Sequence, residues 1–243
     1  MQTTDAPSEF IYQLWPWLEA NKTRLIAAGA GIIIVASIYY FITSQHEQRE
    51  IAAGEALTQA LIEPSHSLTD SATALIKVAD SYTGTVAAKR AILQAGASLF
   101  AAGQYADAQV QFQKFLDQGG TGPLAATAQV GVGASLEAQG KLDQAVTAYQ
   151  RVISSYPGTI SDLPAYCGLG RIAESQGHLQ DALNDYTDAL RIGGQGNSMA
   201  QSAYLSGQAI KLKLDAAAKA APAMKAAAPA APAVKPTLLI PSK

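Results

Sequence analysis

The sequence predicts an all-α protein in which a single transmembrane helix precedes a solenoid of stacked helix pairs. Three observations support this fold class. The chain of 243 residues is rich in alanine, the strongest helix former, while aromatic residues make up only 7% and charged residues 15%. An uncharged apolar run extends from Leu25 to Ile42. Glycines recur every 37 residues after this run, and such a fixed period is typical of repeat architectures.

The first predicted element is a membrane-spanning helix at residues 25–43. At about 1.5 Å per residue, the uncharged run extends roughly 27 Å, which is close to the hydrocarbon thickness of a bilayer. Aromatic side chains lie at both ends of the run, where they favour the headgroup layer. These are Trp15, Trp17, Tyr39 and Tyr40.

Positive charges predict the direction of this helix. Lys22 and Arg24 lie directly before it, whereas the next basic residue after it is Arg49. Because cytoplasmic flanks carry the excess of lysine and arginine, we expect residues 1–24 to be cytoplasmic and the chain after residue 43 to lie outside the cytoplasm.

A cleaved signal peptide is the alternative to a retained anchor, since it also combines a basic flank with an apolar core. Here the flank carries three acidic residues, Asp5, Glu9 and Glu19. No clean small-x-small cleavage site follows the apolar run before the helical stretch that begins at Gln45. The sequence therefore favours a retained anchor.

A repeat of 37 residues organises the chain after the span. One column holds Gly96, Gly133, Gly170 and Gly207. A second column, seven residues later, holds Gly103, Gly140 and Gly177. An alanine and, four residues on, an aromatic residue follow in three units: Ala108 and Phe112, Ala145 and Tyr149, Ala182 and Tyr186. The repeat predicts three helix pairs, near residues 89–122, 126–160 and 163–196.

Each column has a physical reason. A glycine within a helix costs about 1 kcal/mol relative to alanine, so the first column predicts the close approach of a neighbouring helix backbone. The second glycine ends the first helix of a pair, where a positive φ is commonly needed. The alanine is small because two helices cross there, and the aromatic side chain fills the gap between units. Pro157 marks the expected end of the second unit.

Weaker units flank these three. Residues 45–62 predict the first helix of a degenerate unit. The repeat columns of its second helix are occupied by His66, Leu68, Ser71, Leu75 and Val78. At the other end, the helix that contains Gly207 has no partner helix after it. Its charged residues predict a polar cap: Lys211, Lys213 and Asp215.

The solenoid is thus expected to span residues 45–215. Residues 216–243 hold five prolines and four lysines but no acidic residue. Repeated proline breaks helices, so these residues predict a flexible Ala/Pro/Lys-rich tail.

The sequence offers no constellation for catalysis, metal binding or cofactor binding. A net charge of −2 gives no reason to expect nucleic-acid binding, which needs clustered basic residues. Cys167 is the single cysteine, and we expect it to be a packed side chain. Asp181 and Asp185 share one helix face, which an exposed surface explains without acid–base chemistry. The three histidines lie far apart in the sequence: His46, His66 and His178. We therefore expect neither an enzyme nor a cofactor.

The repeat resembles the tetratricopeptide repeat, in which Leu-Gly is followed by Tyr, Ala-x3-Phe and Pro. In the second unit this pattern reads Val132-Gly133, Ala145-x3-Tyr149 and Pro157. The unit is longer here than the family's usual one, and the tryptophan and tyrosine of the first helix are missing. The resemblance implies a right-handed α-solenoid whose concave face, lined by the first helix of each pair, binds other polypeptides.

Counting from the glycine column, the resemblance implies a concave face of mixed apolar and polar side chains, suited to an extended or helical segment of another protein. The face would comprise Arg90, Leu93, Ala97, Phe100, Thr127, Val130, Ala134, Glu137, Cys167, Arg171, Glu174, Tyr204 and Gln208. Some repeats of the family clamp a terminal carboxylate with lysine and asparagine. Leu93 and Ala97 occupy those positions here, so that activity is not expected. Leu93, Phe100 and Val130 could equally serve packing within the array.

The anchor and the repeats together resemble the family of ancillary subunits of the bacterial Sec (SecYEG) translocon, the YfgM-like proteins. Two stretches carry this resemblance, LEANKTRL at residues 18–25 and YTGTVAAKRAILQAG at residues 82–96. It implies a single-pass protein of the bacterial inner membrane whose periplasmic repeat domain assists the translocation of secreted proteins or their hand-over to chaperones. The implied partners are the translocon, periplasmic chaperones or secretory chains.

Two other functions stay open. The same body could be a structural scaffold of a cell-envelope complex for outer-membrane assembly, cell-wall synthesis or secretion. With the reverse topology it would be a cytoplasmic adaptor. The oligomeric state, and any pairing of the span with another membrane helix, also stay open.

Overall fold

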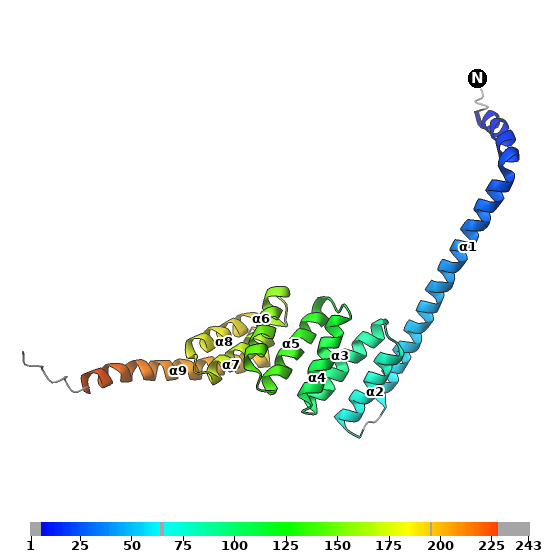
Figure 1. The fold of residues 1–243 in the computed structure, drawn as a ribbon. Helices are drawn as coiled ribbons and strands as arrows, with labels where there is room; N and C mark the ends of the chain where they lie inside the picture. The colour runs from blue at the N-terminus through cyan, green and yellow to red at the C-terminus, as the bar shows by residue number, and fades with distance from the viewer. Residues whose placement is uncertain (1–5, 64–65, 195, 228–243) are drawn as a thin grey trace, which may run out of the picture. The chain divides into compact units, whose positions relative to one another are not determined.

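The computed structural model describes residues 6–63, 66–194 and 196–227, and within these ranges all regular structure is helical (Figure 1). The described residues form nine helices: α1 (Ala6–Ile62), α2 (Leu68–Ser81), α3 (Val86–Ala101), α4 (Tyr105–Asp117), α5 (Gly122–Ala138), α6 (Leu142–Ser155), α7 (Asp162–Ser175), α8 (Leu179–Gly193) and α9 (Ser198–Ala227). The predicted all-α fold class, with a long apolar helix and stacked helix pairs, is confirmed.

The chain divides into two compact units. The first comprises Met1–Pro64 and Ala74–Ala91, and the second comprises Ser65–Thr73 and Ile92–Lys243. The division falls within α2 and α3, so α1 belongs to the first unit and α4 to α9 belong to the second.

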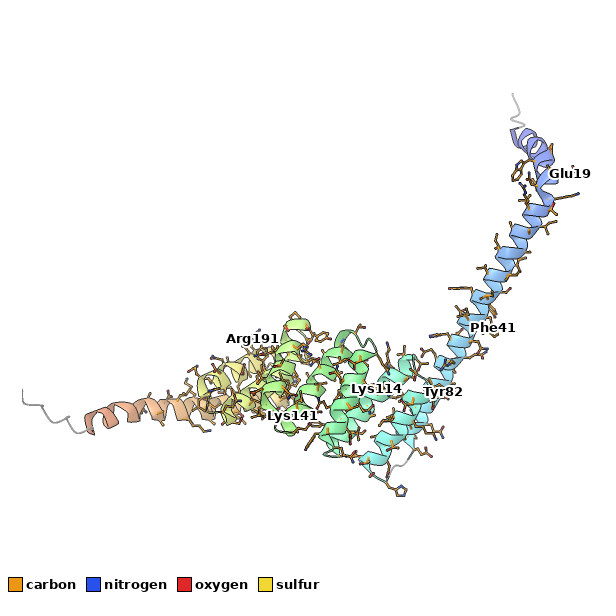
Figure 2. All side chains as sticks on the ribbon, viewed as in Figure 1. Glu19, Phe41, Tyr82, Lys114, Lys141 and Arg191 are labelled. Carbon is orange, nitrogen blue, oxygen red and sulfur yellow. The ribbon has the colours of Figure 1, made fainter. Side chains whose placement is uncertain are left out.

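Helix α1 contains one segment that is long and apolar enough to cross a membrane. Its most apolar stretch has a mean hydropathy of 2.3, and none of that stretch is buried. Ile32 is 70% exposed and Phe41 is 64% exposed. Figure 2 shows the side chains of this segment, Phe41 among them, standing out from the helix. A large exposed apolar surface marks a membrane or protein contact, so this segment needs an apolar environment that no described residue provides.

The end of α1 packs within the first unit. Ala53 is fully buried. The backbone N–H of Val86, at the start of α3, donates to both carboxylate oxygens of Glu50 at 3.1 Å. A carboxylate is favoured there because the first N–H groups of a helix lack backbone partners and carry a partial positive charge. The apolar segment therefore continues without a break into a packed helix of the repeat domain.

In the second unit, consecutive helices from α4 to α9 pack against each other, and α7 also contacts α5 and α9. The turn glycines Gly103, Gly140 and Gly177 have φ values of 78°, 75° and 79°, so the prediction of positive φ is confirmed. The amide after each of these glycines donates to the carbonyl five residues earlier at 2.9 Å, as in a Schellman motif. The second glycine column thus ends each first helix with satisfied carbonyl groups.

The first glycine column has a different partner from the one that the sequence predicts. A Cβ added at Gly133 would come within 2.7 Å of the Tyr149 ring, and one at Gly96 within 2.9 Å of the Phe112 ring. The column therefore makes room for an aromatic ring from the second helix of the same pair. Our expectation that it admits a neighbouring helix backbone is wrong, because the ring fills the space that the missing Cβ leaves.

A further pair of glycines lies on the opposite side of these rings, against their Cδ2 and Cε2 atoms. Gly131 of α5 faces the Phe112 ring, and Gly168 of α7 faces the Tyr149 ring. Tyr149 is only 1% exposed. Each ring therefore joins its own pair to the first helix of the next pair, which couples adjacent repeats. Sequence reasoning missed this column, although Gly131 and Gly168 are also 37 residues apart.

Helix α9 differs from the predicted cap in two respects. It continues to Ala227, whereas the tail is expected from residue 216. Alanine dominates the residues after Asp215, and its helix propensity explains the extension. Leu205 and Leu212 are 61% and 70% exposed, so the surface of α9 is amphipathic rather than purely polar. Residues 228–243 of the predicted tail lie outside the described residues.

Candidate protein-binding surface

The candidate binding residues lie on the first helices of the pairs, α3, α5, α7 and α9. Six of them are exposed: Arg90, Ala97, Thr127, Arg171, Tyr204 and Gln208. Six others are half-buried: Leu93, Phe100, Val130, Ala134, Glu137 and Glu174. Phe100 also packs edge-on against the ring of Tyr105, with 5.2 Å between the ring centroids. Arg90 belongs to the first unit and the others to the second.

Cys167 does not belong to this surface. Its side chain is 5% exposed and lies in the core with Leu163, Tyr186 and Ala203. Burial raises the pKa of its thiol. The expectation of a small packed side chain is confirmed, while its place on the concave face is wrong because the residue turns into the packing between α7 and its neighbours.

Two of the candidate residues line an apolar groove of about 350 Å³. We call it the helix-start groove, because its walls come from the N-terminal halves of α5, α7 and α9 and from the turns that precede α7 and α9. It is lined by Thr127, Val130, Ile160, Ser161, Leu163, Pro164, Asn197, Ser198 and Met199. Ile160 is 67% exposed and Met199 is 45% exposed. None of the lining side chains is charged.

Local hydrogen bonds hold the walls of this groove. Asp162 is buried and accepts a hydrogen bond from the N–H of Gly158 at 2.7 Å, which stabilises the turn that presents Ile160. Asn197 accepts from the N–H of Met199 at 2.9 Å and so caps α9. Sequence reasoning missed Ile160 and Met199 because they lie in and beside turns, outside the repeat columns.

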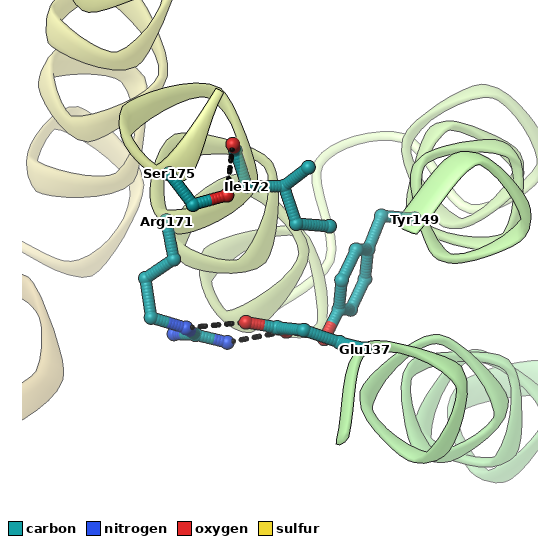
Figure 3. A network of polar contacts seen from close by, with 5 residues as sticks. All are labelled: Glu137, Tyr149, Arg171, Ile172 and Ser175. Atoms are coloured by element: carbon teal, nitrogen blue, oxygen red, sulfur yellow. Dashed lines mark hydrogen bonds and ion pairs between the residues drawn. The ribbon is translucent and has the colours of Figure 1, made fainter. Parts of the chain in front are cut away.

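A polar network joins three helices beside this surface (Figure 3). Nε and Nη2 of Arg171 on α7 donate to the two carboxylate oxygens of Glu137 on α5, each at 2.8 Å. The hydroxyl of Tyr149 on α6 donates to the same carboxylate at 2.7 Å. A bidentate guanidinium–carboxylate pair is among the stronger polar contacts. Burial and the Glu137 charge raise the pKa of Tyr149, and the hydrogen bond to Glu137 raises the pKa of Arg171.

The same kind of contact recurs one unit later. Glu174 lies 37 residues after Glu137, and the ammonium of Lys213 on α9 donates to it at 2.9 Å. The structure therefore pairs Glu137 with Arg171 and Glu174 with Lys213. These four residues connect the first helices of successive pairs.

We expect Glu137→Gln to lower the free energy of unfolding by about 1 kcal/mol, because an amide cannot keep the ion pair with Arg171. The loss stays modest because the Arg171 side chain is 53% exposed and solvent screens its charge. Urea denaturation followed by circular dichroism measures it. Asp188→Asn, which removes an ion pair to Arg191 within one helix, serves as the control with a loss below about 0.5 kcal/mol. Equal losses in the two variants would contradict a coupling between repeats.

Asp181 and Asp185 lie on α8, together with Asp188. Asp181 is exposed and Asp185 is half-buried. Burial, and then the charges of Asp181 and Asp188, raise the pKa of Asp185 to about 6. The folded state therefore binds this proton more tightly than the unfolded state, so the stability contributed by Asp185 falls as the pH rises from about 4 through about 6.

Asp185→Asn is accordingly expected to change the melting temperature little near pH 4 and to raise it by about 2–4 °C near pH 7.5. The gain is small because the carboxyl group is only half-buried and solvent screens it. Thermal unfolding at both pH values measures it, with Asp181→Asn at the exposed neighbour expected to gain less. If Asp185→Asn changes the melting temperature by the same amount at both pH values, the pKa of Asp185 is not raised.

The histidines make no cluster. His46, His66 and His178 are exposed, and His178 directly precedes α8 without a side-chain capping hydrogen bond. In the part of the chain that the structure describes, no group of three or more His, Cys, Asp or Glu side chains is placed to hold a metal ion.

Stacked helix pairs, turn glycines at positive φ and an exposed face on the first helices define a helical-repeat module that binds other proteins. Residues 15–219 match the family model described as "Tetratricopeptide repeat-like domain", and the chain belongs to that family. No curated protein matches the chain. Among solved structures it is similar to the protein described as "MamA RS-1 ArsTM double mutant", with 16% identity, a TM-score of 0.45, and coverage of 70% of this chain and 97% of that one.

Proposed function

We propose that the protein is a non-catalytic, membrane-anchored binding module of the bacterial inner membrane. Residues 1–24 lie in the cytoplasm, and the repeat domain lies in the periplasm. There it assists the translocation of secreted proteins at the Sec translocon or their hand-over to chaperones, as the resemblance to the ancillary translocon subunits implies. The family of the repeat domain supports binding of proteins, and the apolar helix α1 supports the anchor.

The continuity of α1 supports a retained anchor rather than a cleaved signal. The helix extends from Ala6 to Ile62, and its last part buries Ala53 and caps α3 through Glu50. Cleavage behind the apolar segment would cut this helix and remove its anchored half. Lys22 and Arg24 before the segment support a cytoplasmic N-terminus.

The observation that carries the client-handling proposal is the helix-start groove. Its exposed apolar side chains, Ile160 and Met199, attract apolar segments of other chains. Because no charged residue lines it, the groove selects no particular charge pattern in its occupant. Such a surface suits many partly unfolded secretory chains.

A photo-crosslinking side chain at Val130, inside the groove, or at Phe100 tests this proposal in living cells. We expect each to capture many different secretory proteins during export. Gln150 is exposed on the second helix α6 and provides the control position, where little should be captured. Capture no greater from Val130 and Phe100 than from Gln150 would contradict binding at the first helices.

A second candidate function, the structural scaffold of a cell-envelope complex, predicts a different result. The inter-repeat ion pairs of Glu137 and Glu174 favour it, because they stiffen the array. In that case Val130 and Phe100 would capture one partner in a fixed ratio.

The topology has its own test. Alkaline phosphatase fused after residue 215 should be active, and protease added to spheroplasts should degrade the repeat domain. An inactive fusion together with a protected repeat domain would indicate the cytoplasmic adaptor instead.

A further inference from the structure

Gly207 differs from the other three glycines of the first column, because no aromatic ring of the described residues lies against it. Phe112 lies over Gly96, Tyr149 over Gly133 and Tyr186 over Gly170, each ring within 2.9 Å of the position of an added Cβ. At Gly207 the nearest atoms to that position are Cβ of Tyr186 at 3.6 Å and Cδ1 of Leu183 at 3.7 Å. No described side chain places a ring over Gly207.

Gly207 lies in a groove of about 370 Å³ between α8 and α9, which we call the terminal groove. Its apolar part consists of Leu183, Tyr186 and Leu190 of α8 with Ala203 and Gly207 of α9. Tyr204, Gln208 and Lys211 form its α9 edge. In the other pairs, the second helix of the pair covers the corresponding glycine.

Helix α9 does not turn back to cover this groove. Gly177 ends α7 with a positive φ, but the residue 37 positions later is Leu214, and the helix continues through it to Ala227. In the terminal groove, α9 takes the place of the first helix of a fourth pair. No described residue forms the second helix of that pair.

We propose that the terminal groove binds a helix of another protein that carries Ala-x3-Tyr or Ala-x3-Phe, with the aromatic ring seated on Gly207. The three filled sites of the same chain define this occupant, because α4, α6 and α8 each place an alanine and then an aromatic residue four positions later. The bound helix completes a fourth pair. This interaction is separate from the helix-start groove and does not depend on the function proposed for it.

Charge defines the occupant further. Lys211 occupies the column of Glu137 and Glu174. In the second pair, the Tyr149 hydroxyl donates to Glu137, one helical turn after Gly133. An ammonium at this position donates instead of accepting, so it fits a partner helix with an acidic side chain beside the aromatic ring.

A second copy of the chain is a poor source of this helix. The alanines of the three motifs, Ala108, Ala145 and Ala182, are fully buried, and their aromatic partners are at most 5% exposed. These helices are therefore engaged within their own pairs. We therefore assign the occupant to another protein.

A synthetic peptide with the sequence of α8, LQDALNDYTDALRIG, is the probe, because it carries the motif together with an acidic residue directly before the tyrosine. Its binding to the full chain in detergent micelles is measured by fluorescence anisotropy of a dye on the peptide. We expect saturable binding that weakens about tenfold or more when the peptide tyrosine is replaced by alanine.

Gly207→Leu fills the groove, and we expect it to weaken binding of the peptide by about tenfold or more. A Cβ added at Gly207 would meet only ordinary van der Waals contacts, at 3.6 and 3.7 Å. Ala209→Leu, an equal enlargement at an exposed position outside the groove, should change the affinity less than about twofold. Circular dichroism of both variants verifies that they are folded.

Three results would overturn the proposal. The peptide does not bind, or it binds equally well to Gly207→Leu, or the full chain self-associates in sedimentation experiments and Gly207→Leu abolishes this. The last result would assign the groove to a second copy. Crosslinking from Val130 is independent of Gly207, so failure here leaves the helix-start groove unaffected.

Discussion

Replacement of Gly133 by leucine is expected to lower the free energy of unfolding of the repeat domain by about 3 kcal/mol, the upper part of the range for overpacked cores. The added Cβ alone would lie 2.7 Å from the Tyr149 ring. This ring cannot move aside, because Gly168 faces it from the next pair and the residue is only 1% exposed. The strain therefore acts on three helices together, α5, α6 and α7.

Chemical denaturation followed by circular dichroism measures this loss. The matched control is Gly207→Leu, which makes the same change in the same column of the repeat. No ring covers Gly207, and leucine has the higher helix propensity, so this variant should be within about 1 kcal/mol of the natural protein. An unchanged unfolding midpoint of Gly133→Leu would contradict the ring-on-glycine packing.

Lysine at both Ile33 and Val35 is expected to release the protein from the membrane. The two positions lie in the middle of the apolar run and are 67% exposed each. A lysine at the centre of a membrane helix costs about 2.5–3.5 kcal/mol on insertion scales, so two cost roughly 5–7 kcal/mol. This is enough to prevent stable insertion of a single span. Carbonate extraction of cell membranes, with detection of the protein in the soluble and pelleted fractions, measures the effect.

The control places the same charges on the same helix but outside the apolar run. Ile51 and Ile62 are 59% and 75% exposed, and Ile51→Lys with Ile62→Lys should leave the protein in the membrane fraction. If both doubly substituted proteins remain in the membrane to the same extent, residues 25–43 do not anchor the chain.

Much of the fold could be predicted because its signals are local. Glycine at positions 103, 140 and 177 predicts a backbone with positive φ, as the structure has it at Gly103, Gly140 and Gly177. Such a helix end can be predicted because it depends on only a few neighbouring residues. The apolar run of α1 is equally local. The sequence prediction ends α9 at Asp215, whereas the helix continues to Ala227, because the high helix propensity of the alanines outweighs the proline in this stretch.

Less of the candidate site could be predicted. Counting from the glycine column located residues that are exposed or half-buried, such as Thr127 and Val130. It also assigned Cys167 to the surface, although the residue is buried. Ile160 and Met199 were missed because a turn has no repeat register. The pairing of Glu137 with Arg171, 34 residues apart, depends on how neighbouring helices approach each other.

By itself, the sequence determined that this protein has a long apolar helix and a regular series of helix pairs, because propensity, hydropathy and turn chemistry act over a few residues. Only the tertiary structure decided what fills the space beside each glycine, which carboxylates join neighbouring repeats and where grooves remain open. These features depend on side chains from different helices meeting in three dimensions. Gly133 and Gly207 are identical in the repeat pattern, yet one is covered by a ring and the other faces an open groove.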